Sequence, residues 1–260
     1  NWKKQLDTCK TKADRDVFFD HVKKLNLRNS IFIDNTASES ISEEYGRYLA
    51  SNIGVVTCNK IACASSFKNY LDLKKISRRY NAPFLFETNV GAGLPVIDTL
   101  NNLIASGDKI HKIQAILSGS LNYIFNKFNS KTTFKNVVQN AQNEGFTEPD
   151  PKIDLSGVDV ARKILILARE SGFKLELKDI VNRNFLPLEV LDSLSNEEFY
   201  NAIDKNEVHF QNILKNAEEK GARLKYVAQL EQGKASVGLQ EIESSHDFYN
   251  LEGSDNIILF

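Results

Sequence analysis

Residues 30–59 read SIFIDNTASESISEEYGRYLASNIGVVTCN and contain two short apolar runs on either side of a polar segment of helical length. The runs SIFID (30–34) and GVVTCN (54–59) have the length and composition of buried strands. A third run, PFLFET (83–88), follows another helix-length segment that extends to Tyr80. Short apolar strands that alternate with helices are typical of βαβ units and a parallel sheet. These residues therefore predict a doubly wound α/β fold.

The remainder of the chain predicts a second region with a different kind of sheet. One helix is bracketed by Pro95 at its start and Gly107 after its end, which is the usual asymmetry of helix termini. Three later apolar runs suit an antiparallel or mixed sheet: RLKYVAQLE (223–231), KASVGLQEI (234–242) and NIILF (256–260). We therefore expect an incomplete Rossmann-type nucleotide-binding domain over residues 1–92 and an α+β domain over residues 93–260.

The composition excludes several classes of protein. The 260 residues have a formal net charge of −1, with 42% hydrophobic and 26% charged residues, which is typical of a globular protein. A near-neutral chain without blocks of Lys or Arg offers no electrostatic surface for nucleic acid. No apolar run approaches the roughly 20 residues needed to cross a bilayer. The four histidines are scattered, which argues against a transition-metal site, and three cysteines without a CxxC pair indicate a reducing compartment such as the cytoplasm.

The glycine loop that cradles a dinucleotide in many doubly wound folds is missing. Residues 1–45 contain no glycine, and Gly91-Ala92-Gly93 is followed by valine at position 96, so it is not a GxGxxG motif. These two glycines are typical of a tight strand-to-helix turn. The sequence also lacks methionine, even at position 1. Either the chain is a piece of a longer protein or a modified methionine is missing from the printed sequence, and we treat it as a piece. Any phosphate loop would then lie upstream. We therefore expect poor dinucleotide binding by residues 1–260 alone, which a micromolar affinity for NADP would contradict.

The segment GFTEPDPKIDLSGVDVARK (145–163) concentrates carboxylates on a stiff loop that leads into a helix. Its four acids are Glu148, Asp150, Asp154 and Asp159. The prolines at positions 149 and 151 hold the preceding residues out of the helical region. We expect Ser156 to cap the helix, with Asp159 completing a capping box. Asp159 and Lys163 are four residues apart and share one helix face.

Two interpretations of this pair remain open from spacing alone. A helix cap with an ordinary surface ion pair would contribute less than about 1 kcal/mol and needs no function. Residues 164–168 are all apolar, however, which predicts a buried helix beyond Lys163. A lysine at the mouth of a buried helix, opposite rigid acids, suits a small zwitterion. Carboxylates would hold its ammonium group, and the lysine would act on a polarised oxygen.

The same segment resembles the signature of homoserine dehydrogenases. The matching residues are Ala141, Gly145, Pro151, Asp154, Gly157, Asp159 and Lys163. Further matches are IDNTAS (33–38), VVTCNK (55–60), ETNVGAGLPV (87–96) and ILSGSLNYIF (116–125), so the resemblance extends along essentially the whole chain. The segment TNVGAGLPV (88–96) and the N-terminal residues NW are most similar to the dehydrogenase half of bifunctional aspartokinase–homoserine dehydrogenases.

The resemblance implies NAD- or NADP-linked interconversion of aspartate 4-semialdehyde and homoserine, on the route to threonine, methionine and isoleucine. It implies the catalytic residues Lys163, Asp159 and Lys60. It implies substrate contacts at Glu148, Asp154, Thr88 and Gly91. It implies cofactor contacts at Thr36, Ala37, Ser38, Asn59 and Lys60. It also implies a monovalent cation, Na⁺ or K⁺, at the backbone carbonyls of Glu87, Val90, Ala92 and Leu94, and a homodimer or higher homo-oligomer built on the second domain.

Without the resemblance, these positions have simpler interpretations. Thr36 and Ser38 would be ordinary helix-start residues, and Lys60 a solvated lysine. One departure from the family is visible, because a second acid and, before it, an arginine usually precede Asp154. Here these positions are Ile153 and Lys152, and we interpret Ile153 as peripheral.

Two rival functions remain. The first is an oxidoreductase for another amino-acid semialdehyde, which a comparison of substrates would distinguish. The second is a non-catalytic module kept for dimerisation or for regulating an attached kinase. It predicts that Lys163→Ala leaves turnover of the longer protein unchanged. The choice between NAD and NADP is not determined, because the strand end that reads the ribose would lie upstream.

Overall fold

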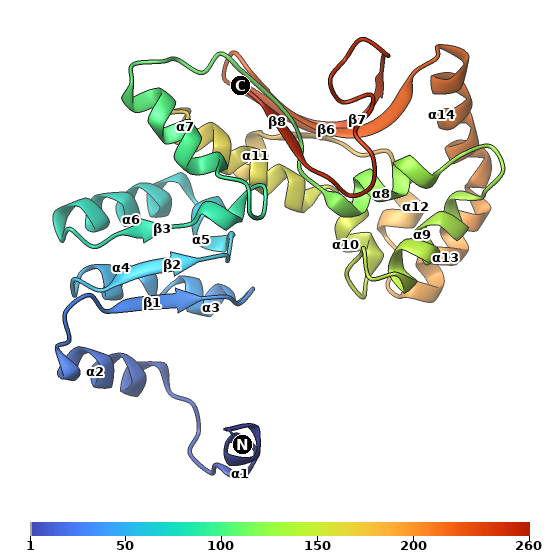
Figure 1. Cartoon of the computed structure of the whole chain (residues 1–260). Coiled ribbons are helices and arrows are strands. Elements are labelled where there is room, and N and C mark those ends of the chain that lie inside the picture. Colours follow the sequence, from blue (N-terminus) through green and yellow to red (C-terminus); the bar gives the residue numbers. More distant parts are fainter. Residues whose placement is uncertain (1) are drawn as a thin grey trace.

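The computed structural model describes residues 2–260, and its strands form two separate sheets linked by helices (Figure 1). The elements of the first sheet and its helices are α1 Trp2–Thr8, α2 Arg15–Leu25, β1 Ile31–Asp34, α3 Glu39–Ser42, α4 Tyr45–Leu49, β2 Gly54–Thr57, α5 Ile61–Ala64, α6 Phe67–Arg79 and β3 Phe84–Leu85. The later elements are η1 Glu87–Asn89, α7 Val96–Ala105, β4 Lys112–Ile116, α8 Gly119–Lys127, α9 Phe134–Asn143, α10 Pro151–Leu155, α11 Val158–Glu170, η2 Leu177–Asp179, β5 Val181–Arg183, α12 Leu188–Leu191, α13 Asn196–Lys205, α14 Glu207–Glu219, β6 Arg223–Glu231, β7 Lys234–Ile242 and β8 Ile257–Leu259. No helix in the described range has the length and apolarity that a membrane span requires.

The first sheet is parallel, with the order β1-β2-β3, and it confirms the predicted α/β class. Helix α4 packs against β2 because Tyr45, Tyr48 and Leu49 are buried on one of its faces. The ring of Tyr48 stacks on Phe32 of β1 at a centroid distance of 4.1 Å. Strand β1 lies at the edge of this sheet. The carboxyl ends of its three strands point the same way, and α5, which follows β2, contacts α11 (Figure 1).

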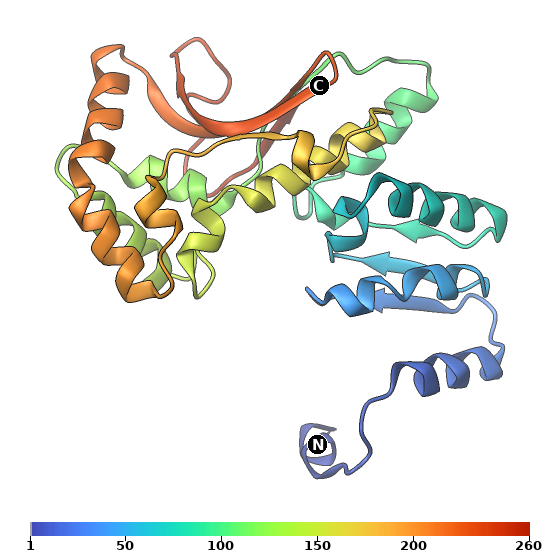
Figure 2. The ribbon, with the colours of Figure 1, turned by 180° about the vertical axis from the view of Figure 1, so that it is seen from behind.

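The second sheet is mixed, with the order β5-β7-β6-β4-β8. Strands β5 and β7 are parallel and all other neighbours are antiparallel, as the sequence predicted for this region. The β6–β7 hairpin turns through Gln232 and Gly233, which both have positive φ, the geometry of a tight two-residue turn. Helices lie against one face of this sheet (Figure 2), and a separate small apolar cluster forms around Phe248. The carbonyls of residues 251, 253 and 255 accept hydrogen bonds from Asn122 and Asn126 of α8.

Helix α11 joins the two regions. It contacts α5 near the first sheet and β6 and β7 of the second (Figures 1 and 2). Residues 164–168 are fully buried, which confirms the buried helix predicted from their composition. The start of α11 therefore has a fixed position relative to both sheets.

The prediction that Ser156 caps α11 is wrong. A short helix that the sequence did not indicate, α10, begins after the N-cap Asp150, and Ser156 ends it. The N-cap of α11 is Gly157, with φ of 72°, a left-handed conformation that favours glycine. A Cβ atom at this position would lie 1.9 Å from Oη of Tyr226 on β6. The close approach of β6 therefore decides the residue at the start of α11.

Candidate active site

The first turns of α11 present the predicted catalytic pair. Nζ of Lys163 lies 2.8 Å from Oδ2 of Asp159, and Nζ of Lys60 lies 3.3 Å from Oδ1 of the same carboxylate. Lys60 follows β2 and immediately precedes α5, so it comes from the first sheet. One carboxylate on α11 thus bridges two lysines that are more than 100 positions apart in the sequence.

The charge state of Asp159 follows from these neighbours. Burial opposes its charged form, but the charges of Lys163 and Lys60 outweigh burial and lower the pKa of the carboxyl below its ordinary value. The side chain is 40% exposed, so a small molecule can reach it from solvent. Asp159 is therefore an ionised, accessible acid at neutral pH.

Lys163 is oriented by a second contact. Its Nζ donates to the backbone carbonyl of Leu117, at 2.7 Å, just after the end of β4. An ammonium group has three N–H donors, and Asp159 and Leu117 account for two of them. The third can donate to an oxygen atom of a substrate at the mouth of α11.

The acid loop is arranged around Asp154. Its Oδ2 accepts the backbone N–H of Glu148 at 2.8 Å, and its Oδ1 accepts the hydroxyl of Ser120 at 2.9 Å. Burial raises the pKa of Asp154 above its ordinary value, despite these two hydrogen bonds, and the charge of Asp159 adds to the effect. A bound cation would reverse this destabilisation of the carboxylate. The carboxylate of Asp150, in contrast, caps α10 by accepting the N–H of Lys152.

The predicted cofactor contacts lie at the carboxyl ends of β1 and β2. Nδ2 of Asn59 donates to the carbonyl of Ser38 at 2.9 Å and to Oδ2 of Asp34 at 3.1 Å. The N–H of Thr36 donates to Oδ1 of Asp34 at 2.8 Å. Thr36 and Ala37 are exposed. This edge of a parallel sheet is where ligands of doubly wound folds bind.

The remaining predicted contacts lie in η1, which contains Glu87 and Thr88, and in the loop between η1 and α7. The carboxylate of Glu87 accepts the N–H groups of Ile97 at 2.7 Å and Asp98 at 2.9 Å, so its side chain caps the start of α7. Gly91 and Ala92 have φ of 78° and 52°, which turns the chain sharply between η1 and α7. The carbonyl of Glu87 already accepts one backbone hydrogen bond, and so does that of Leu94. Each carbonyl oxygen has a second lone pair, so one hydrogen bond leaves it able to accept a second contact.

A family model described as homoserine dehydrogenase matches residues 95–260. Over its whole length the chain is 37% identical to the homoserine dehydrogenase of Schizosaccharomyces pombe, and it covers 71% of that protein. The chain belongs to the homoserine dehydrogenase family. The resemblance drawn from the signature is thereby confirmed.

Longer relatives of the family match the chain equally well. The chain is 41% identical over 262 residues to bifunctional aspartokinase/homoserine dehydrogenase 1, chloroplastic, of Zea mays. It is 38% identical to the bifunctional aspartokinase/homoserine dehydrogenase of Haemophilus influenzae. All of this chain is covered in both comparisons, but only 28% and 32% of these relatives. The chain therefore spans less than a third of the length of the bifunctional relatives.

Solved structures share the fold. The crystal structure of a Candida auris protein of unknown function has a TM-score of 0.89 and 33% identity, over 96% of this chain and 72% of that one. A hyperthermophilic archaeal homoserine dehydrogenase in complex with NADPH has a TM-score of 0.66 and 25% identity, over 88% and 60% of the two chains.

The structure adds residues to the site of this family member that the sequence patterns did not indicate. Asp34 is buried at the end of β1, and the hydroxyl of Tyr45 donates to it at 2.5 Å. Burial raises the pKa of Asp34, but the hydrogen bonds from Tyr45 and the Thr36 N–H outweigh burial and lower it overall. Asp34 could have been predicted from the sequence, because it is an acid at the end of an apolar strand, whereas no sequence pattern indicates Tyr45.

The departure at Ile153 is also explained. Its side chain is 55% exposed, whereas the next residue, Asp154, points its carboxylate to Ser120. The apolar side chain therefore lies outside the hydrogen-bond network of the acid loop.

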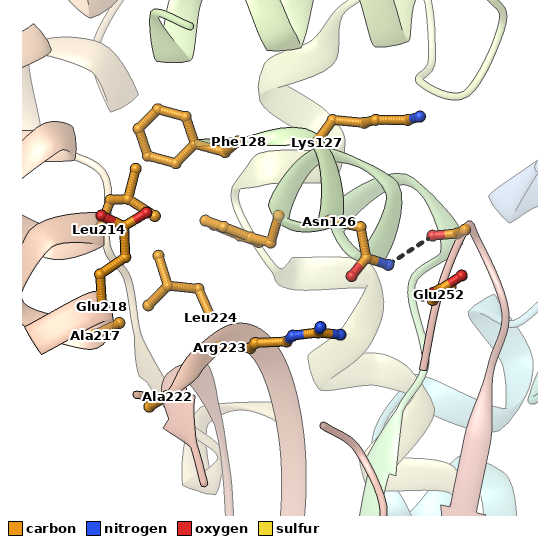
Figure 3. A pocket seen from close by; sticks show the side chains of 12 residues that line it. Asn126, Lys127, Phe128, Leu214, Ala217, Glu218, Ala222, Arg223, Leu224 and Glu252 are labelled. Carbon is orange, nitrogen blue, oxygen red and sulfur yellow. Dashed lines mark hydrogen bonds between the residues drawn. The ribbon is translucent and has the colours of Figure 1, made fainter. Parts of the chain in front are cut away.

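A separate hollow of about 400 Å³ lies between the ends of α8 and α14 and the start of β6 (Figure 3). Phe128, Leu214 and Leu224 form its apolar wall. Two polar groups at its edge contact protein neighbours, since Asn126 donates to the Gly253 carbonyl at 3.0 Å and Arg223 lies over the ring of Tyr249. None of the predicted site residues lines this hollow.

Proposed function

We propose that the protein containing this chain is an NAD(P)-dependent homoserine dehydrogenase, which interconverts L-aspartate 4-semialdehyde and L-homoserine. The observation that carries the proposal is the exposed carboxylate of Asp159 held between Lys163, which lies on the same helix α11, and Lys60, which lies between β2 and α5. Membership of the family and the NADPH complex of the archaeal relative support it.

The geometry suits proton transfer to and from an oxygen atom. In the reductive direction, a bound nicotinamide cofactor would supply a hydride to the aldehyde carbon, and the aldehyde oxygen then needs a proton. Lys163 as the ammonium has a third N–H beyond those that meet its two protein partners and can give that proton. Asp159 stabilises the positive charge before the transfer and orients Nζ through the 2.8 Å contact. Lys60 contacts the same carboxylate and assists the transfer.

Substrate recognition in this proposal depends on the acid loop. Asp154 and Glu148 hold the α-ammonium group of the amino acid, and Thr88 in η1 and Gly91 in the loop after it contact the substrate. The environment of Asp154 fits this role because burial makes its negative charge costly until a cation arrives. The two hydrogen bonds that the carboxylate accepts fix its direction in the meantime.

The cofactor, NADP or NAD, contacts Thr36, Ala37, Ser38, Asn59 and Lys60. Asp34 supports this edge of the sheet, since it accepts hydrogen bonds from Asn59 and the Thr36 N–H. A Na⁺ or K⁺ ion binds the carbonyls of Glu87, Val90, Ala92 and Leu94, in the turn that separates the first sheet from α7.

The wider organisation is part of the same proposal. Residues 1–92 act as part of the cofactor domain and residues 93–260 as the substrate and dimerisation domain, which the two separate sheets support. The protein works as a homodimer or higher homo-oligomer. Three cysteines without a disulfide among the described residues support a reducing compartment, which we propose is the cytoplasm. Several relatives carry chloroplastic names, so the plastid is the alternative to test.

The test is homoserine-dependent reduction of NADP by the full-length protein and by its Lys163→Ala variant. We expect the variant to lose about two or more orders of magnitude in kcat, the usual contribution of general acid–base catalysis. Equal turnover by the two proteins would remove Lys163 from the mechanism. Absence of turnover in both would favour a regulatory module, and faster turnover of another amino-acid semialdehyde would change the substrate.

A further inference from the structure

The last turn of α11 carries two charged residues that are almost completely buried. Arg169 and Glu170 are 3% and 7% exposed, and their side chains point toward α5 and α6 of the first sheet. Buried charges are costly unless they are paired and hydrogen-bonded. Both are fully paired here, and neither contacts the candidate active site at the other end of the helix.

Arg169 binds the short helix α5 at its end. Nη1 donates to the carbonyl of Cys63, in the last turn of α5, at 2.8 Å, and Nη2 lies 3.0 Å from Oε2 of Glu176. Both carboxylate oxygens of Glu176 accept the N–H of Phe67, the first residue of α6, at 3.0 and 3.1 Å. Arg169 therefore lies at the C-terminal end of α5, and Glu176 lies at the N-terminal end of α6. Each side-chain charge is opposite in sign to the partial charge of the helix end that it contacts.

Glu170 makes the same connection to α6. Its carboxylate accepts the hydroxyl of Tyr70, and Nζ of Lys74 lies 2.9 and 3.1 Å from its two oxygens. The contacts of Arg169, Glu170 and Glu176 therefore fix the final turn of α11 to the α5–α6 junction. We call these three residues the α11 clamp.

The α11 clamp and the active site hold opposite ends of the same two helices. Lys60 immediately precedes α5, which has only four residues, and its Nζ contacts Asp159 at the start of α11. Arg169 holds the other end of α5, ten residues further along α11, or about 15 Å at 1.5 Å per residue. Helix α5 is thus fixed to α11 at two points, and the first of them is the proton-handling site (Figure 1).

We propose that Arg169, together with Glu176, is a positioning residue that sets the distance between Lys60 and Asp159 by fixing α5 along α11. The inference rests on the proposed function only in assigning Lys60 to the reaction. A purely structural pair would lower stability without a specific effect on Lys60. The α11 clamp instead makes the geometry of one lysine depend on an arginine at the far end of the helix.

The test is a double-mutant cycle in the full-length protein with Arg169→Lys and Lys60→Ala. Lysine keeps the charge but lacks the planar fork that reaches Cys63 and Glu176 together. We expect Arg169→Lys to lower kcat for homoserine oxidation by about tenfold, with a smaller change in KM, and to have no further effect when Lys60→Ala is present. Effects that multiply, or an unchanged kcat for Arg169→Lys, would overturn the proposal.

A matched control is Arg47→Lys, which weakens another ion-paired arginine, bound to Asp16 and Glu44 in the first region. In the double mutant, the factors by which Arg47→Lys and Lys60→Ala change kcat should multiply, as expected for independent sites. If Arg169→Lys does not fold, Glu176→Gln removes the carboxylate that pairs with Arg169, with little change in shape, and should show the same dependence on Lys60.

A second readout does not require activity. Reductive methylation followed by mass spectrometry measures how accessible the Lys60 amine is, and Lys60 is 28% exposed and paired in the structure. Labelling of Lys60 should increase severalfold in Arg169→Lys but not in Arg47→Lys. Unchanged labelling would refute the positioning role. Increased labelling in a protein that never oxidises homoserine would sustain the positioning role and refute the proposed function.

Discussion

Replacing Gly157 by alanine should destabilise the protein more than the same change at a matched glycine. Gly157 has φ of 72°, and alanine in a left-handed conformation costs about 1–2 kcal/mol. A Cβ atom would also lie 1.9 Å from Oη and 2.8 Å from Cζ of Tyr226, so β6 or α11 must move. Overpacking of this kind costs about 1–3 kcal/mol, which gives a total of about 2–5 kcal/mol.

The matched control is Gly172→Ala, just after the other end of α11. Gly172 has φ of 91°, but no atom lies within 4 Å of the position that a Cβ atom would take there. Alanine at this position therefore costs only the backbone strain of about 1–2 kcal/mol. Urea unfolding of both variants and the wild-type protein gives the difference between the two losses of stability. Equal losses at the two positions would refute the argument that the contact with Tyr226 requires glycine at position 157.

Two further measurements test the electrostatics. Asp34→Asn should lower the free energy of unfolding by about 1–3 kcal/mol at neutral pH, because its donors lose a charged acceptor. Since the folded pKa of Asp34 lies below 3.8, this stabilisation should be present above that value and disappear as the pH falls, so wild type and variant converge in acid. Burial lowers the pKa of Lys225 from 10.5 to about 8, so the unfolded state binds the proton of this amine more tightly than the folded state does. The free energy of unfolding of the wild-type protein should therefore rise between these two pH values. The Lys225→Met variant should not show this rise.

The sequence by itself determined the local structure and the family. The apolar runs at residues 30–34, 54–59, 223–231 and 234–242 all contain strands, as their composition predicted. The prediction that the first run is buried is wrong, because β1 lies at the edge of its sheet and Ile31 and Ile33 are 56% and 62% exposed. The apolar run after Lys163 became the buried part of α11. Helix α9 could also have been predicted, since Phe134, Val137, Val138 and Ala141 follow the spacing of one buried helix face. The signature around Lys163 was sufficient to identify the family because its residues have fixed spacing.

Tertiary structure alone decided which distant groups meet. Spacing on one helix brings Asp159 to Lys163, but only the packing of α5 against α11 brings Lys60 to the same carboxylate. Spacing also suggested Ser156 as the N-cap of α11. The N-cap is Gly157 instead, where Tyr226 of β6 leaves no room for a Cβ atom. Local patterns depend on a residue's neighbours in the chain, and these neighbours are known directly from the sequence. Contacts between α5, α11 and β6 depend on how separate elements pack around one core, and no local pattern specifies that arrangement.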